Sequence, residues 1–307
     1  MFRFWLYGGF YMSSLRLPYL IAVTALVLIA FAGNSVLNRL ALVEGLIDPV
    51  SFVGLRVVSG AGLLVALLLW RGARQAGLRG GLRAQWQWPH GTSVGGLAVY
   101  MAGFTFAYLH LDAGVGALIL FAVVQLGMFA WAVRMGQQVP VLQWLGMVVA
   151  LAGLVLMLWP GEGARVPLLA AALMAVAGLG WAAFSLAGAQ ARAPLAATAW
   201  SFALIVPLFL GLMMFNLASL HMTGPGVALA LAAGMLTSGL GYALWYLVLP
   251  QLGATRAAVA QLTVPVIAIL LGALLIDESF GLRFAMATCL VVIGTLIALI
   301  ARPKPGQ

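Results

Sequence analysis

The sequence predicts an all-α membrane protein whose ten transmembrane helices form two inverted five-helix repeats. Three observations lead to this fold class: the composition, a series of apolar runs about 20 residues long, and a match between the third and eighth runs. Of the 307 residues, 64% are hydrophobic and 7% are charged, and the mean hydropathy is +1.13. A soluble domain carries roughly 25% charged residues. A chain this apolar cannot hide its surface from water, so its solvent must be lipid.

Ten apolar runs, bounded by glycine, proline or charge, are long enough to cross a membrane. About 20 helical residues at roughly 1.5 Å each match a hydrocarbon core of about 30 Å. In chain order the predicted spans are 18–38, 50–70, 92–109, 115–133, 141–159, 167–188, 197–215, 227–249, 256–275 and 284–301. Because these runs do not alternate polar and apolar residues, they are not the strands of a membrane barrel.

The basic residues predict which side of the membrane each loop occupies, because lysine and arginine collect on the cytoplasmic side. With the N-terminus inside, eleven of the fifteen basic residues fall in inner segments: Arg3, Arg16, Arg71, Arg74, Arg79, Arg83, Arg134, Arg192, Arg256, Arg302 and Lys304. All six acidic residues fall outside: Glu44, Asp48, Asp112, Glu162, Asp277 and Glu278. Both termini are therefore expected in the cytoplasm, and the protein in the bacterial inner (cytoplasmic) membrane as a multi-pass protein.

The third and eighth spans match at a constant offset of 138 residues. Gly96 aligns with Gly234, Gly103 with Gly241, and Tyr108 with Tyr246. Five spans are thus followed by five equivalent spans, and because five is odd the second set enters the membrane from the opposite side. Inverted repeats are common in secondary transporters, whose substrate site lies near the midplane between the halves.

The repeat divides the chain into four parts. Residues 1–16 are a cytoplasmic lead, 17–160 the first five-helix repeat, 166–301 the second repeat, and 302–307 a cytoplasmic tail. The N-terminal segment has no small-residue cleavage site after a short apolar core, so no cleaved signal peptide is expected.

Several short segments resemble the EamA-type transporters of the drug/metabolite transporter superfamily. In the first half these are AGNSVLNRLAL (32–42), with Phe31 where tryptophan is usual, and DPVSFVGLR (48–56), in which Arg56 falls on the family's arginine. Gln125 and Gln138 depart from the pattern, because they stand where proline and glutamate stand in the second half.

The second half resembles the same family in GWAAFSLAGAQ (180–190), GYALWYLVL (241–249) and QLTVPVIAILLGALLIDES (261–279), with Glu278 on the acidic residue that ends the ninth helix. The likeness covers nearly the whole chain in ten-helix form. The pattern is also similar to the aromatic amino-acid exporters of the superfamily. The resemblance implies a transporter and identifies the fold better than the substrate.

Arg56 lies deep in the second span, where a charge costs about 2.5–3.5 kcal/mol on insertion scales. A structural interpretation has its guanidinium bound to the carbonyl ends of broken helices, or reaching outward to Glu44 or Asp48. A functional interpretation makes it an anchor for the carboxylate of an anionic or zwitterionic substrate, through its forked donors. Both interpretations stay open at this point.

Polar and aromatic side chains recur at helical spacing in several spans and predict a substrate pocket. An amide that faced hydrocarbon would be costly, so each amide must face a partner or a cavity. The candidate substrate-binding residues are Asn34, Asn38, Arg56, Tyr100, Phe104, Phe121, Gln125, Trp181, Ser185, Ser238, Tyr242, Trp245, Gln261 and Pro265. Pro265 is expected to break a helical hydrogen bond in mid-span. Tyr108 and Tyr246 are alternatively interfacial belt residues.

The placement of the acids bears on coupling. No aspartate or glutamate lies in the middle of a span, whereas proton-driven exporters of cationic drugs need a buried carboxylate. We therefore expect an uncoupled exporter of small amphipathic metabolites, with aromatic or other amino acids as the favoured substrates. A proton-coupled exporter of drugs or lipophilic cations is the alternative, with Asp48, Asp112 and His110 near span ends as its relay.

Other function classes have little support in the sequence. The three histidines lie near loops, no G-x-S-x-G or H-E-x-x-H motif is present, and Cys289 is alone, so we expect no enzyme, metal or cofactor. An intramembrane enzyme is a remote alternative. The charge of +9 is explained by membrane orientation rather than by nucleic acid. The expected partners are a small-molecule substrate and membrane lipid, including anionic lipid at the basic loop 72–91. We expect a monomer or a weak homodimer through the apolar fifth and tenth spans.

Overall fold

The structure is a computed structural model that describes residues 17–85, 89–136, 139–159, 166–191, 193–278 and 280–300. The predicted lead 1–16, the tail 302–307 and Gln138 lie outside these ranges. The helices are α1 (Leu17–Val43), α2 (Pro49–Gln85), α3 (Gly91–Ala107), α4 (Ala113–Arg134), α5 (Val141–Leu158), α6 (Leu168–Ala189), α7 (Pro194–Phe215), η1 (Leu217–Ser219), α8 (Gly224–Ala232), η2 (Ala233–Leu240), α9 (Gly241–Gln261), α10 (Thr263–Leu275) and α11 (Leu282–Ile300). The described chain forms no strand, so the all-helical class is confirmed.

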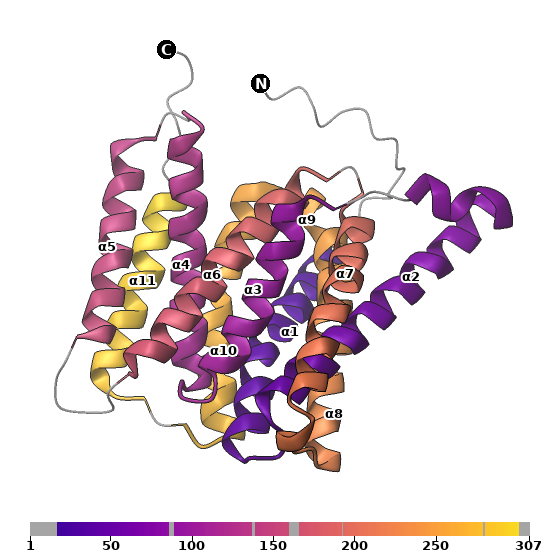
Figure 1. Ribbon diagram of the computed structural model, residues 1–307. Coiled ribbons are helices and arrows are strands. Elements are labelled where there is room, and N and C mark those ends of the chain that lie inside the picture. The colour runs from indigo at the N-terminus through magenta and orange to yellow at the C-terminus, as the bar shows by residue number, and fades with distance from the viewer. Residues whose placement is uncertain are drawn as a thin grey trace.

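Among the described helices, seven are long and apolar enough to span a membrane, and α10 and most of α11 are shorter apolar helices. Figure 1 shows them as a bundle of steeply inclined rods. Large apolar side chains such as Leu168, Leu274 and Phe215 are exposed on its flanks, as a lipid-facing surface requires. A multi-pass membrane protein follows from this arrangement, whereas the count of ten spans stays a prediction.

Two predicted boundaries are wrong. The eighth span, 227–249, is built from α8, the π-helix η2 and the start of α9, and α9 then continues through residue 250 to Gln261. The helix is interrupted at Leu262, which keeps right-handed helical backbone angles, and Pro265 therefore lies in the first turn of α10, just after this break, rather than inside an unbroken helix. Proline is tolerated there because the first amide groups of a helix have no intrahelical partner.

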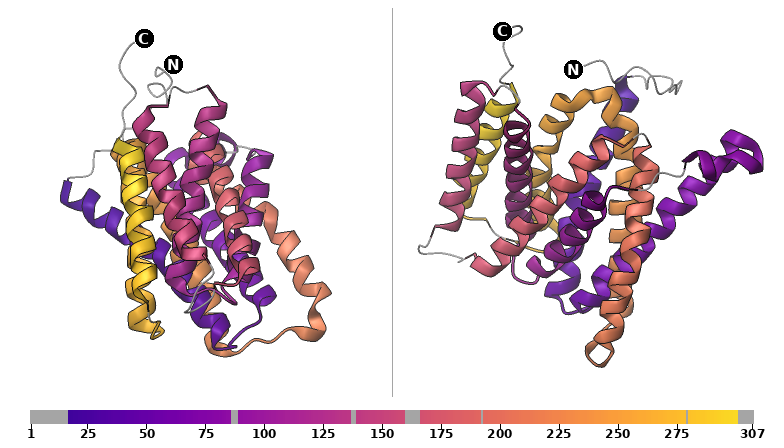
Figure 2. Two further views of the ribbon diagram at one scale, coloured as in Figure 1. Left: turned by 90° about the vertical axis from the view of Figure 1, so that its left-hand side faces the viewer. Right: turned by 45° about the horizontal axis from the view of Figure 1, so that its top comes forward.

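The basic loop predicted at 72–91 is also corrected, because α2 continues as helix to Gln85. This stretch holds no proline before residue 89, and its alanine, leucine and arginine residues favour helix. Figures 1 and 2 show this end of α2 extending away from the bundle.

Helices of the first half pack against helices of the second half. The most extensive contacts are α5 with α11, α3 with α6, and α2 with α7. In Figure 1 the α5–α11 pair stands at one side of the bundle, next to α4, as expected for peripheral helices. A two-fold relation between halves would pair the second helix with the seventh and the fifth with the tenth. The inverted repeat itself remains a prediction.

The α3–α6 pair is unusually close, because glycine meets glycine at the crossing. A Cβ on Gly96 would lie 2.6 Å from the Gly180 carbonyl oxygen, and a Cβ on Gly180 would lie 2.7 Å from that of Gly96. Small residues at such crossings let two membrane helices approach backbone to backbone. Tyr100 follows Gly96 by four residues, and Trp181 directly follows Gly180. The close crossing therefore brings these two aromatic side chains together in the interior.

The connections α1–α2 and α7–α8 meet at one face of the bundle, the lower face in Figure 1. Ile47 and Met222 form an isolated bridge, and Asp48 accepts backbone hydrogen bonds from Ser51 and His221, both at 2.9 Å. Asp48 thus ties the start of α2 to the second half. The chain segments α3–α4 and α10–α11 turn at the same face.

Candidate functional site

A small cavity lies where helices from both halves converge. The first half contributes α1, α3 and α4, and the second contributes α6 and α9. The lining consists of Phe31, Asn34, Ser35, Tyr100, Phe104, Leu120, Phe121, Trp181 and Tyr242. We call this space the central cavity. Six of its nine lining residues are phenylalanine, tyrosine or tryptophan, four from the first half of the chain and two from the second.

The central cavity is almost filled by the side chains that line it. Its free space is about 10 Å³, which is room for roughly one water molecule. An amino acid or a drug-sized molecule does not fit beside the side chains as they stand. In this arrangement aromatic side chains fill most of the space between the halves.

Trp181 lies at the centre of the aromatic contacts. Its ring is 4.8 Å from the ring of Tyr100 and 5.1 Å from that of Tyr242, measured between centroids, and Phe31 meets it edge-on at 6.2 Å. Such tilted and edge-to-face pairs are worth about 0.5–1.5 kcal/mol each beyond the area they bury. The cavity wall is thus cohesive, but it is made of rings that can rotate rather than of backbone.

Arg56 lies behind this wall and is fully buried. Its Nε donates to the Ser238 hydroxyl at 3.2 Å, and its Nη2 donates to the Tyr100 hydroxyl at 3.2 Å. The guanidinium carbon also lies 5.6 Å from the centre of the Tyr100 ring and 5.1 Å from that of Phe104. Arg56 therefore touches two side chains that line the cavity.

No ion pair neutralises Arg56 within the described ranges. The predicted alternative in which Arg56 reaches outward to Glu44 or Asp48 is wrong, since its partners are a serine, a tyrosine and two aromatic faces. A buried cation without an anion is costly, and ring faces recover only part of that cost.

Three buried donors around the cavity have no hydrogen-bond partner in the described part of the chain. They are Nη1 of Arg56, Nε1 of Trp181 and the hydroxyl of Tyr242. A buried polar group without a partner costs about 1–3 kcal/mol. Three such groups from three helices, α2, α6 and α9, are an arrangement that a bound molecule with acceptor atoms would satisfy.

The amides of α1 take part in a polar network that also includes Ser238, the partner of Arg56. The Asn34 Oδ1 accepts from the hydroxyls of Thr237 at 2.5 Å and Ser238 at 3.4 Å, and its Nδ2 donates to the Thr237 carbonyl. Asn38 donates to the Asn34 carbonyl and accepts from Thr105 at 3.2 Å. The bonds of Asn34 join α1 to the π-helix η2, and that of Asn38 with Thr105 joins α1 to α3. Local π-helical segments often occur at functional sites.

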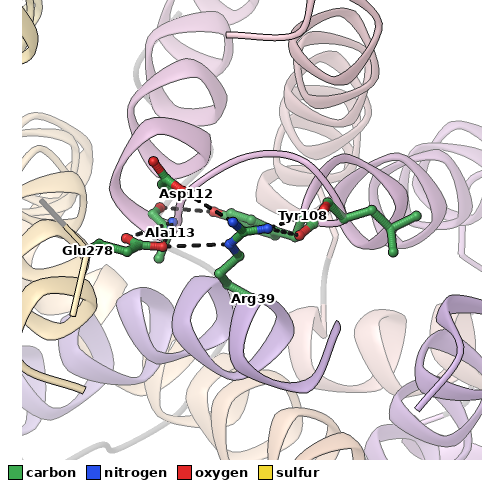
Figure 3. Close-up of polar contacts among 6 residues, drawn as sticks. Arg39, Tyr108, Asp112, Ala113 and Glu278 are labelled. Atoms are coloured by element: carbon green, nitrogen blue, oxygen red, sulfur yellow. Dashed lines mark hydrogen bonds and ion pairs between the residues drawn. The ribbon is translucent and has the colours of Figure 1, made fainter. Parts of the chain in front are cut away.

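A second polar cluster lies at the face where the α1–α2, α3–α4 and α10–α11 connections turn. Arg39 donates to the carbonyls of Tyr108 and Leu109 and to Oδ1 of Asp112, at 3.2, 3.2 and 3.3 Å. Its Nε lies 3.8 Å from Oε1 of Glu278. We call Arg39, Asp112 and Glu278 the rim cluster; Figure 3 shows Arg39 reaching between the two carboxylates.

Glu278 also caps α4 from the other half of the chain. Its two carboxylate oxygens accept from the Ala113 amide at 2.8 and 3.0 Å, at the N-terminus of that helix. Burial raises the pKa of the Glu278 carboxyl above its ordinary value, and Asp112 raises it further, against the opposing effects of the Ala113 amide and Arg39. The rim cluster thus contains a carboxyl that accepts a proton more readily than a free glutamate.

The rim cluster and the central cavity are joined by the aromatic face of α3. Tyr108 is fully buried, its ring lies 4.7 Å from that of Phe104, and its hydroxyl donates to the Ala113 carbonyl at 3.2 Å. The alternative of Tyr108 as an interfacial belt residue is therefore wrong. Its position near a span end predicted exposure, but the α3–α4 turn folds it inward.

The structure brings together most of the predicted site residues. Those that line the central cavity are Asn34, Tyr100, Phe104, Phe121, Trp181 and Tyr242. Asn38, Arg56, Ser238 and Trp245 contact lining residues, Trp245 through a ring contact with Phe31 at 5.7 Å. Gln125, Ser185, Gln261 and Pro265 lie outside the lining. A role in substrate binding remains a prediction for all of them.

Sequence reasoning missed several residues of these two clusters. Phe31 and Ser35 line the cavity beside Asn34, and Thr237 bonds to it. A signal was present for Phe31, which precedes Asn34 by three residues on one helix face. No comparable signal joined Arg39 to Glu278, which are 239 positions apart and meet only through the turns of three connections.

The three histidines, His90, His110 and His221, are all exposed. The described residues contain no group of three or more histidine, cysteine, aspartate or glutamate side chains that could hold a metal ion.

Comparisons with known proteins agree with this architecture. Residues 167–300 match the EamA-like transporter family. Over 285 residues the chain is 42% identical to the uncharacterized protein PA1977 of Pseudomonas aeruginosa, covering 93% of this chain and 95% of the relative. A solved crystal structure shares the fold with a TM-score of 0.67 at 20% identity, over 93% of this chain and 99% of that one. The chain belongs to the EamA-like transporter family of multi-pass membrane proteins.

Proposed function

We propose that this protein is a secondary transporter that exports small amphipathic metabolites bearing a carboxylate, aromatic amino acids among them, by alternating access. The observation that carries the proposal is Arg56, which is fully buried, has no ion-pair partner in the described chain, and touches the wall of the central cavity. A guanidinium offers forked donors that match a carboxylate.

The aromatic wall supports the apolar half of the proposed substrate. Rings of Phe31, Phe121, Trp181 and Tyr242 line a space between the two halves, where secondary transporters bind their cargo. Because that space now holds about one water, substrate entry requires ring rotation. Tyr100 is the natural candidate to move, since a carboxylate could replace its hydroxyl as the partner of Arg56.

The rim cluster supports the closure of one face during the transport cycle. Arg39, Asp112 and Glu278 join α1, the start of α4 and the α10–α11 connection. In the predicted orientation this face is the external one, and opening it releases the cargo outside. The cycle proposed here moves substrate down its own gradient, since no carboxylate lines the cavity.

The alternative of a proton-coupled exporter of lipophilic cations is less well supported. A cationic drug would bind beside a buried arginine, with no acidic side chain among the nine lining residues to neutralise it. The acidic pair that could exchange a proton, Asp112 and Glu278, lies at the rim and already holds Arg39.

Reconstitution tests the proposal directly. Purified protein in liposomes should release preloaded labelled phenylalanine or tryptophan in a saturable manner, with unlabelled aromatic substrate competing and threonine competing less. The rate should not increase when an inward proton gradient is imposed. Release that needs an inward proton gradient would replace the uncoupled cycle by a coupled one. Absence of saturable release for every carboxylate tested would refute the substrate class.

A further inference from the structure

The hydrogen-bonding groups left open at the central cavity are donors. The guanidinium of Arg56 and the indole nitrogen of Trp181 can only donate, and the Tyr242 hydroxyl has its proton uncommitted in the described structure. Together they call for a ligand that brings acceptor oxygens. A carboxylate brings two oxygens with about four acceptor positions.

Acceptors for a substrate ammonium group are scarce at the same place. The side-chain oxygen of Asn34 already accepts from Thr237 and Ser238, and that of Asn38 accepts from Thr105. The hydroxyls of the lining, those of Ser35, Tyr100 and Tyr242, can accept a hydrogen bond but carry no negative charge. An ammonium group buried here would therefore lack the anionic partner that an α-amino acid requires.

The net charge of the occupied site also favours a carboxylate that carries no amino group. Arg56 gives the empty site one unneutralised positive charge within the described chain. An aromatic carboxylate without an amino group brings the total to zero. A zwitterionic amino acid leaves it at plus one, and an aromatic amine raises it to plus two. In a site shielded from water the neutral total is the favoured one.

We propose, on the basis of the transport function proposed above, that the preferred substrates are amine-free aromatic carboxylates, such as aryl-substituted 2-oxo acids and arylacetic acids. The zwitterionic amino acid of the same ring is the poorer substrate. Export of such an anion needs no coupling ion, because a membrane potential that is negative inside drives it outward by itself.

The test compares compounds that share a phenyl ring and differ in charge. Proteoliposomes are loaded with labelled phenylalanine, and unlabelled phenylpyruvate, phenylacetate, phenylalanine and phenethylamine compete at matched concentrations, with protein-free liposomes correcting for passive leak. Phenylpyruvate or phenylacetate should compete at least tenfold more strongly than phenylalanine, and phenethylamine least. Because wild-type protein is used, misfolding of a variant does not enter the result.

A second readout uses the charge of the transported species. With labelled phenylpyruvate inside, a potassium gradient and valinomycin make the lumen negative. Efflux of the anion should accelerate, whereas efflux of phenylalanine should not change.

The outcomes separate the two proposals. Equal or stronger competition by phenylalanine would overturn the preference for amine-free acids and leave aromatic carboxylate transport standing. Strongest competition by phenethylamine, or no saturable flux with any carboxylate, would overturn both.

Discussion

Arg39 and Arg56 are two arginines on neighbouring helices that meet opposite surroundings. Arg39, on α1, is 15% exposed through its side chain and lies between the carboxylates of Asp112 and Glu278. Arg56, on α2, is fully buried, and it contacts a serine hydroxyl, a tyrosine hydroxyl and two aromatic ring faces. The charge of Arg39 is neutralised locally by these two carboxylates. Arg56 leaves a charge for something outside the chain to neutralise.

This difference predicts that the two arginines respond oppositely to the same change. A methionine at either position keeps an unbranched, flexible side chain, shorter than that of arginine, while it removes the charge and the donors. At Arg39 the change leaves two carboxylates, Asp112 and Glu278, without their basic partner, whereas Arg56 has no carboxylate partner in the described chain. The four predictions below run from the largest expected effect to the smallest.

The largest effect is expected on transport by Arg56→Met. Losing a charge-assisted contact to a carboxylate in a dry site should lower the ratio of maximal flux to half-saturating concentration by about 100-fold. Arg39→Met should lower it by less than about tenfold, since that side chain does not line the cavity. Initial efflux rates in proteoliposomes measure both. Arg56→Lys, which keeps charge but loses the fork, is expected between them, and full transport by that variant would end the anchor role.

Thermal unfolding should show the reverse order. Arg39→Met leaves Asp112 and Glu278 facing each other without a cation and should destabilise the fold by about 1–2 kcal/mol. Arg56→Met removes an unpaired buried charge, so its stability should be unchanged or higher. Melting temperatures in detergent, without substrate, give the comparison. A marked loss of stability in Arg56→Met would mean that this arginine is structural after all.

The unpartnered donors give a smaller effect that separates binding from folding in the same way. Trp181→Phe and Tyr242→Phe keep an aromatic ring and remove one donor that has no partner in the described structure. Each should weaken substrate binding about fivefold to tenfold while slightly raising the melting temperature of the empty protein. Trp131→Phe on the lipid-facing side of α4, where the side chain is 41% exposed, is the matched control and should change neither. Parallel losses of binding and stability would contradict a ligand role.

The smallest effect is expected from pH at the rim cluster. In the closed arrangement the pKa of Glu278 is raised, chiefly by burial, whereas an open rim would expose this carboxyl to water and return it to its ordinary value. The closed form therefore binds the proton more tightly. Acidification of this face through the interval between the two pKa values should favour closure and slow efflux about twofold to threefold.

Glu278→Gln is the control for this pH dependence, because its amide oxygen can still accept from the Ala113 amide without titrating. Its efflux rate should stay flat over the same pH interval. Acceleration of the wild-type protein by acid at this face would show that protonation opens the rim rather than holding it closed.

The α-helical membrane fold could be predicted from the sequence because the information is local. The length of each apolar run predicts the helices α1, α2, α4 and α6. Asp48, Asp112 and the prolines mark where helices begin. The prediction was wrong between residues 249 and 263: Pro250, Gly253 and Arg256 end the apolar run, but the helix continues through them to Gln261 and is interrupted only at Leu262. The end of an apolar run and the end of a helix are different properties, and composition reports only the first.

The candidate site was predictable in part for the same reason. Helical spacing placed Tyr100 with Phe104 and Asn34 with Asn38, and a charge in an apolar run singled out Arg56. Spacing gives the face that residues share but not the direction in which that face points. Tyr108 is therefore buried rather than interfacial, and Gln125 lies outside the cavity lining although it shares a helix with Phe121.

The π-helix η2 fixes the number of residues between two parts of the site. Its i→i+5 hydrogen bonds take in one residue more per turn than an α-helix does, and Ser238, the partner of Arg56, lies within it just ahead of Tyr242 and Trp245 on α9. Deleting a single residue from this stretch would let it relax into an α-helix and rotate one side of the site against the other by roughly 100°. Relatives that share this site should therefore align across residues 233–240 without gaps. The number of residues in this helical segment then marks the family as clearly as the identity of the site residues does.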